Sequence, residues 1–167
     1  MTLSMYSASV PVFSRLLKNL RTFLEKAEAY AEQRGFKPDV LVEARLAPDM
    51  LPLRFQVQTL TDTVKGCVAR LAGKEIPAWP DEEKTIADLK ARLQKAIDYL
   101  ETYSAADIDG SEGKTITMKI GGKEREIDGL SYLLGRALPN GYFHTTTAYA
   151  ILRHNGVPLG KSDFLAQ

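Results

Sequence analysis

Two polar residues, Asn140 and His144, stand one helical turn apart in an otherwise apolar stripe near the C-terminal end of the chain. The stripe consists of Leu133, Ala137, Asn140, His144, Ala148 and Ile151. Spacings of three and four residues place its members on one face of an α-helix. An imidazole and a carboxamide facing a core could bind a metal ion, exchange a proton or hydrogen-bond a ligand. A buried polar group without a partner costs about 1–3 kcal/mol, so we expect both to meet polar groups inside the protein.

Four amphipathic helices are predicted to position these residues, because apolar side chains recur at helical spacing. They cover about residues 11–32, 49–73, 82–103 and 130–156. The first begins with Ser9 as cap and Pro11 in its first turn, or else nearer Ser4 with a kink at Pro11. Asp49 is the expected N-cap of the second helix.

The fourth helix carries the stripe, with Asp128 as its predicted cap and a kink expected near Pro139 and Gly141. Just before it, residues 114–127 alternate in polarity around Gly121-Gly122. This pattern predicts a short β-hairpin, which is too small to stand alone and should lie against the helices. In the tail, Phe164 and Leu165 are expected to hold the chain end to the helices.

Length, charge and composition exclude several classes of protein. A chain of 167 residues predicts one domain over 1–167. A net charge of +1 without a dense basic run argues against nucleic acid as a partner. No apolar run reaches the roughly 20 residues of a membrane span, and no convincing signal peptide is present. The expected compartment is therefore the cytoplasm. The single Cys67 can form no internal disulfide and is expected in the core.

The end of the fourth predicted helix resembles the last helix of DinB/YfiT-like proteins. That likeness rests on His144, then Leu152-Arg153, then the run Asn155-Gly156-Val157-Pro158. The stretches LSMYSASVPVF, ARLAPDMLPL and AYAILRHNGVPLGKSDFL resemble one branch of that superfamily, a domain of unknown function. The resemblance spans nearly the whole chain. It implies an all-α, DinB-like four-helix bundle with crossover connections and a small β-hairpin before the last helix.

The resemblance also implies where a metal would bind. Many DinB-like proteins hold a divalent metal through three histidines, one from the second helix and two from the fourth at i and i+4. Some are metal-dependent thiol transferases or isomerases. His144 matches the last of these histidines by position, Asn140 stands at its i−4 partner, and the second predicted helix has no histidine. We therefore predict no tightly bound transition metal and no other cofactor.

A weaker divalent-metal site is the alternative. In it, a nitrogen of His144, the oxygen of Asn140 and an oxygen of Asp49 or Gln56 would hold a hard or borderline ion. The favoured interpretation is instead a hydrogen-bonded polar cluster between the second and fourth helices. On either reading Asn140 and His144 point inward, and His144 lies near Gln56 or Asp49.

Other polar residues have simpler structural explanations. His154 lies ten residues after His144, about 15 Å along a helix, and is expected to serve as a cation at the helix C-terminus. Asp62 and Lys65 are expected on a solvated face or in a surface ion pair of little energetic weight. Trp79 is expected to cover an end of the bundle.

Three functional classes compete on these observations. The favoured one is a non-catalytic bundle with a degenerate metal site, whose polar cluster at His144, Asn140, Gln56 and Asp49 binds a small molecule. The second is a metal-dependent enzyme of the thiol transferase or isomerase type that uses His144. The third is an interaction module that pairs as a homodimer through its helix faces.

Overall fold

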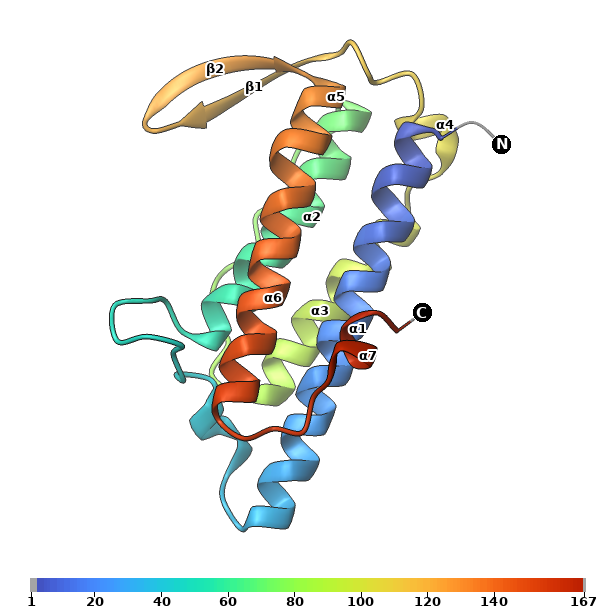
Figure 1. Ribbon diagram of the computed structural model, residues 1–167. Coiled ribbons are helices and arrows are strands. Elements are labelled where there is room, and N and C mark those ends of the chain that lie inside the picture. The colour runs from blue at the N-terminus through green and yellow to red at the C-terminus, as the bar shows by residue number, and fades with distance from the viewer. Residues whose placement is uncertain (1–2, 167) are drawn as a thin grey trace.

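The computed structural model describes residues 3–166, together with every side chain among them except that of Ile120. The protein is mostly helical, with one small two-stranded antiparallel sheet. Its long helices are α1 (Met5–Arg34), α2 (Leu53–Ala72), α3 (Ile86–Glu101) and α6 (Leu138–His154). Helices α1 and α2 each pack against both α3 and α6, as the ribbon shows (Figure 1).

Helix α1 begins at the earlier of its two predicted starts. Ser4 is the N-cap and forms a reciprocal capping box with Ser7. Ser9 is therefore not a cap; it lies inside the helix and donates to the Met5 carbonyl at 2.6 Å. Pro11 also lies within the helix. Gly35 ends α1 at a φ of 75°, a conformation that glycine adopts without strain.

The prediction of Asp49 as the cap of α2 is wrong. Helix α2 begins at Leu53, after Pro52, and the residue before a proline is disfavoured in helical geometry. The first amides of α2 find backbone acceptors instead: Leu53 N–H donates to the Ala44 carbonyl and Arg54 N–H to the Val42 carbonyl. Because carbonyls of the preceding loop satisfy these amides, the helix needs no side-chain cap.

Helix α3 begins at Ile86, four residues after its expected start, because Thr85 and Asp88 form a capping box there. Shorter helical elements occupy the connections: η1 (Pro38–Leu41), α4 (Ala105–Ile108) and α7 (Lys161–Phe164).

The predicted fourth helix is a composite of three elements. It comprises α5 (Gly129–Tyr132), a π-helical turn η2 (Leu133–Ala137) and α6. Asp128 is its N-cap, as predicted, and accepts from Ser131 N–H at 2.9 Å. The irregularity expected near Pro139 is this π turn, which ends at Ala137. Pro139 lies just after it, in the first turn of α6. Because Pro139 has no N–H to donate to an earlier carbonyl, the regular ladder has to change there.

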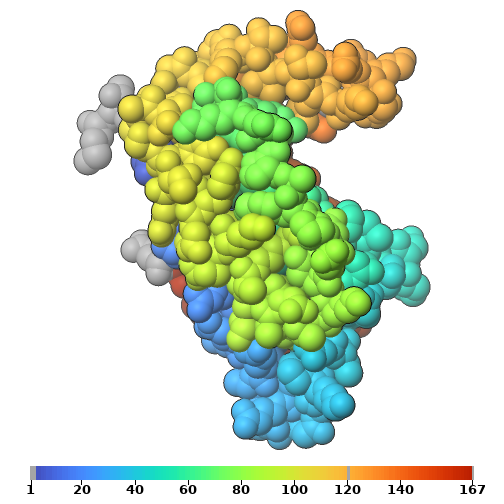
Figure 2. All heavy atoms as spheres, turned by 180° about the vertical axis from the view of Figure 1, so that it is seen from behind, coloured from blue at the N-terminus to red at the C-terminus, as the bar shows by residue number. Residues whose placement is uncertain are grey.

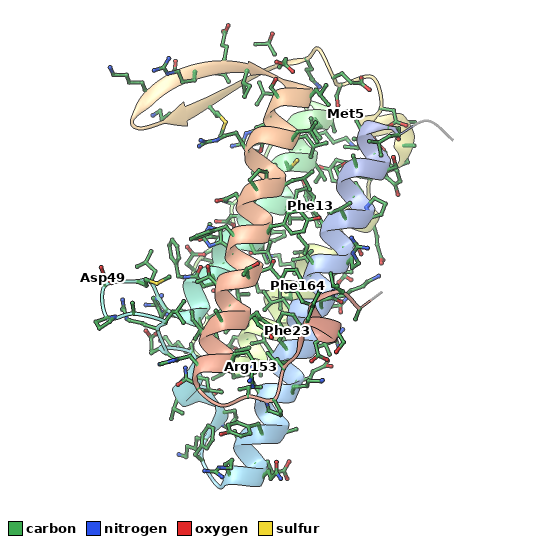
Figure 3. The ribbon with its side chains drawn as sticks, in the orientation of Figure 1. Met5, Phe13, Phe23, Asp49, Arg153 and Phe164 are labelled. Carbon is green, nitrogen blue, oxygen red and sulfur yellow. The ribbon has the colours of Figure 1, made fainter. Side chains whose placement is uncertain are left out.

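The apolar core lies between the long helices. Phe13 and Phe23 of α1 point toward α6 (Figure 3). Phe164 of the tail stacks on Phe23 with ring centroids 6.3 Å apart, as its predicted role requires. Asn19 adds hydrogen bonds from its amide to the carbonyls of Phe164 and Ala166. Leu165, in contrast, is 60% exposed and does not anchor the tail.

The predicted hairpin forms β1 (Thr115–Ile120) and β2 (Lys123–Asp128), paired so that Met118 faces Arg125 across the strands. The hairpin meets the helices through the buried Ile116 and the half-buried Met118 and Ile127. The turn end projects away from them (Figure 1). Among residues 3–166, no helix is long and apolar enough to cross a membrane. That residues 1–167 form one domain stays a prediction.

Candidate functional site

His144 and Gln56 meet inside the protein, between α6 and α2. His144 is 7% exposed and Gln56 is 3% exposed. The imidazole Nδ1 lies 2.8 Å from Gln56 Oε1. Of the two neighbours that the sequence offered for His144, Gln56 and Asp49, this contact selects Gln56.

The hydrogen bonds of Gln56 determine which nitrogen of His144 carries the proton. Gln56 Nε2 donates to the Leu51 carbonyl at 2.9 Å, so the amide oxygen faces the imidazole. A carboxamide oxygen only accepts, and Nδ1 must therefore be the protonated nitrogen. Nε2 of His144 then carries a lone pair, and it makes no hydrogen bond to any residue in the described part of the chain.

The surroundings of His144 favour its neutral form. Burial lowers the pKa of His144 below its ordinary value. Aromatic rings flank the imidazole edge-on: Phe55 at 6.2 Å and Phe143 at 5.2 Å between ring centroids. A neutral imidazole with a fixed tautomer can accept one hydrogen bond or offer one nitrogen to a metal.

Asn140 does not point inward with His144, contrary to the prediction. It is exposed, and its amide Nδ2 donates to Thr63 Oγ1 of α2 at 2.7 Å. Gly141 takes the inward position instead, where an added Cβ would come within 3.1 Å of the Phe13 ring. The other members of the stripe are buried as expected. Asn140 lies on the flank of that stripe, where a small rotation decides between core and surface.

Asp49 does not reach His144 either. It is exposed on the loop before α2, and its label in Figure 3 lies well outside the packed helices. This loop is held instead by backbone bonds and by Arg45, whose guanidinium donates to the Met50 carbonyl. The four candidate residues therefore separate into one pair in contact, His144 with Gln56, and two residues that lie elsewhere.

The donor set around His144 does not fit a transition-metal site. A competent zinc site needs three or four nitrogen, sulfur or carboxylate ligands. Here the imidazole is the only strong donor, and the oxygen of Gln56 is already committed to Nδ1. Over residues 3–166, no group of three or more His, Cys, Asp and Glu residues is arranged to hold a metal. His154, at the end of α6, is exposed.

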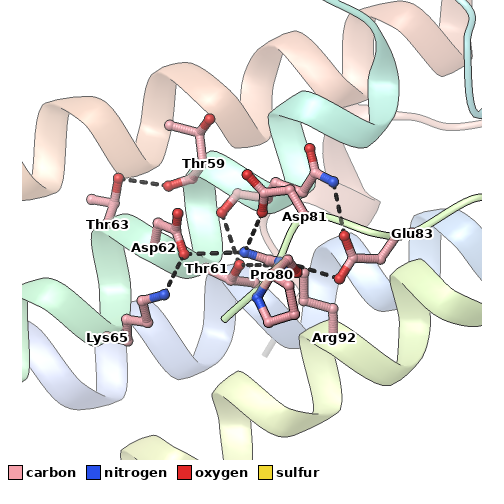
Figure 4. Close-up of polar contacts among 10 residues, drawn as sticks. Thr59, Thr61, Asp62, Thr63, Lys65, Pro80, Asp81, Glu83 and Arg92 are labelled. Atoms are coloured by element: carbon pink, nitrogen blue, oxygen red, sulfur yellow. Dashed lines mark hydrogen bonds and ion pairs between the residues drawn. The ribbon is translucent and has the colours of Figure 1, made fainter. Parts of the chain in front are cut away.

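A second polar cluster was missed at the level of sequence. Arg92 of α3 was not singled out in the sequence, and its side chain is 3% exposed. The guanidinium donates, over distances of 2.8 to 3.1 Å, to Thr61, Pro80, Asp62 and Glu83, and it forms an ion pair with Asp81 at 2.9 Å (Figure 4). These contacts satisfy the donors of the guanidinium, so Arg92 links α2, α3 and the connection between them.

The same cluster contains the expected ion pair of Asp62 with Lys65, but Lys65 is not at the surface. Lys65 is buried, and its ammonium lies 2.6 Å from Asp62 Oδ1 and 4.7 Å from the Trp79 ring. Trp79 also packs edge-on against Tyr99. Burial acts to raise the pKa of Glu83, but hydrogen bonds from Gln58 and Arg92 outweigh it and lower the pKa. No sequence signal indicates this cluster, because two of its acids, Asp81 and Glu83, lie in the connection between α2 and α3.

The fold and the position of His144 define a helical protein of the DinB type. The chain is similar to a DinB family member protein from Shewanella denitrificans, with 43% identity over 97% of this chain and 92% of the other, and a TM-score of 0.88. Residues 5–165 match the family model described as Domain of unknown function (DUF1993), and the chain belongs to that family. The comparison with curated proteins found no match. The resemblance seen in the sequence is therefore confirmed.

Proposed function

We propose that this protein is a non-catalytic four-helix bundle of the DinB type, with crossover connections, in which His144 accepts a hydrogen bond from a small ligand. The observation that carries the proposal is the relay from His144 Nδ1 to Gln56 and on to the Leu51 carbonyl. This relay fixes the tautomer and leaves Nε2 as the acceptor. A fixed acceptor beside aromatic rings suits a ligand with one donor group and an apolar body.

A recess in the surface next to His144 offers a ligand a route to the imidazole. A recess of about 360 Å³ is lined by apolar and hydroxyl side chains, among them Leu46, Tyr142, Phe143 and Thr147. His144 itself does not line this recess, but Phe143, which does, packs on the imidazole and is 57% exposed. Rotation of one exposed side chain is a common change on binding, and it would open the recess toward Nε2.

A phenol is the probe that this geometry suggests, because its ring suits the recess and its hydroxyl can donate to Nε2. The chain contains only two histidines, so imidazole nitrogen NMR resolves both without assignment difficulty. Titration with 4-methylphenol should shift the Nε2 signal of His144 and leave that of the exposed His154 in place. Phe143→Ala should ease the binding and His144→Gln should abolish it. The proposal would be refuted if the signals of both histidines shifted equally, or if 4-methylphenol saturated His144→Gln as it does the wild type.

The competing function is a metal-dependent enzyme of the thiol transferase or isomerase type that uses His144. The donor set gives it no support, since the only amide oxygen beside the imidazole is engaged. Elemental analysis of protein purified without an affinity tag or chelator distinguishes the two. A homodimer stays a prediction, to be measured by light scattering of the same sample.

A further inference from the structure

The π turn η2 lies beside a pocket that the His144 site does not include. This pocket, of about 250 Å³, is lined by Thr63, Met118, Tyr132, Gly135, Arg136, Ala137 and Asn140. Its walls therefore come from α2, from strand β1 and from the composite last helix. Seen from behind in Figure 2, the hairpin stands out from the helices, with a hollow beneath it. Single π turns inside helices occur frequently at functional sites.

One cationic side chain, that of Arg136, lines the pocket, and no carboxylate does. Arg136 of the π turn is exposed and forms no ion pair with any residue between 3 and 166. Arg70 of α2 reaches the same region, since it donates to the Tyr132 hydroxyl at 3.1 Å. Burial raises the pKa of Tyr132 to about 12, against the opposing effect of Arg70 and Arg136. The hydroxyl of Tyr132 thus lies within the field of both guanidinium groups and stays protonated.

The hairpin carries a further arginine, Arg125, on the face that it turns toward the pocket. Arg125 is paired directly with Met118 across the strands, and residues directly opposite each other share a face of the sheet. Met118 lines the pocket, so Arg125 lies on the same face. Glu124 and Glu126 are the neighbours of Arg125 in β2 and therefore fall on the opposite face. The hairpin consequently separates its charges, with its acids turned away from the pocket.

We propose that this pocket binds a small organic anion through its carboxylate or phosphate group, held between the guanidinium groups of Arg136, Arg70 and Arg125. Guanidinium forks match the oxygens of both groups. Met118 and Ala137 supply an apolar wall for the body of the ligand. The amide of Asn140, held by Thr63 Oγ1, has a second N–H to offer. A pocket below about 300 Å³ suits a metabolite smaller than a drug-sized ligand.

The site is independent of the function proposed for His144. His144 does not line the pocket, and the proposed anion makes no use of its Nε2. Binding at either site can therefore fail without affecting the other.

Titration calorimetry on the full chain tests the proposal with three probes: succinate, inorganic phosphate and uncharged succinamide. Succinate or phosphate should saturate one site with a Kd of about 1 mM or tighter, and the better of the two identifies the group recognised. Succinamide should not bind. Arg136→Gln should weaken the binding about tenfold or more, because it removes a charged donor.

A matched control separates a local site from general attraction. Arg34→Gln removes the same charge from an exposed position at the end of α1 and should change the affinity less than twofold. Arg125→Gln serves as the second test variant, since it lies on the projecting hairpin and leaves the helical core untouched. Circular dichroism confirms that each variant is folded. The proposal is overturned if neither anion saturates, if succinamide binds equally well, or if Arg34→Gln weakens binding as much as Arg136→Gln.

Discussion

Replacing Gln56 with leucine should lower the free energy of unfolding by about 2 kcal/mol. The substitution leaves the Nδ1–H of His144 buried without an acceptor, and an unsatisfied buried donor costs about 1–3 kcal/mol. The substitution also removes the donor that Gln56 Nε2 offers to the carbonyl of Leu51, a residue that is 47% exposed. Leucine and glutamine have similar volumes, so no large cavity forms.

Urea denaturation followed by circular dichroism and by the fluorescence of the single Trp79 measures this change. The slope of the transition should stay constant, so that the midpoint alone moves. Gln33→Leu is the matched control: Gln33 is exposed on α1, and a surface change of this kind stays within about 0.5 kcal/mol.

The double variant Gln56→Leu/His144→Leu makes the experiment specific to the pair. His144→Leu alone strands the oxygen of Gln56, whereas replacing both partners by apolar groups can be nearly neutral. The double variant should therefore cost clearly less than the sum of the two single variants. The reasoning is refuted if the costs add, or if Gln56→Leu behaves like Gln33→Leu.

Three further outcomes follow from the same geometry. Burial lowers the pKa of His144 in the folded protein, so as the pH falls below about 6.5 this histidine is protonated in the unfolded chain before it is protonated in the folded one. The free energy of unfolding should therefore decline from that pH toward the lower folded pKa. Urea titrations at a series of pH values should show this slope in the wild type and not in His144→Gln. Protein purified without an affinity tag or chelator should contain no stoichiometric zinc or nickel; elemental analysis that finds such a metal, lost in His144→Ala, would contradict this. Arg92→Lys should lower the free energy of unfolding by about 3 kcal/mol, since it breaks a buried charge network. Arg21→Lys, in an exposed pair with Glu25, should change it by less than about 1 kcal/mol; equal effects in the two variants would contradict a structural role for Arg92.

The helices could be predicted because their buried faces follow one period. The apolar stripes of α2 and α3 are buried where spacing placed them, and that of α1 is buried except for the half-buried Val12 and Tyr30. Asp128 was identifiable as a cap because its side chain bonds an amide only three residues away. Asp49 offered the same local signal, but a proline and two carbonyls from the preceding loop decided where α2 begins. Local signals are reliable only where no tertiary contact competes with them.

The polar clusters show the same limit of local sequence signals. Gln56 could be offered in advance as a neighbour of His144, together with Asp49, because the stripe of His144 faces a core and Gln56 lies beside the stripe of α2. Arg92 could not, because an arginine at the edge of a helical stripe normally extends its charge into water. Its burial depends on Asp81 and Glu83, which belong to a connection with no periodic pattern. The anion pocket has no sequence signal at all, since it depends on the pairing of Met118 with Arg125 and on the π turn.

Asn140 and His144 illustrate how little separates a core position from a surface one. Residues four apart on a helix are neighbours, about 5–6 Å between their Cβ atoms. Yet His144 meets Gln56 in the core, while Asn140 meets Thr63 at the rim of a pocket beside the π turn. Gly141 accounts for the difference, because its missing side chain lets the ring of Phe13 approach α6 at the position that Asn140 was expected to take. One turn of helix therefore borders two separate environments, a neutral acceptor in the core and a cationic pocket at the surface, where the two-histidine pattern of DinB-like proteins would have built a single metal site.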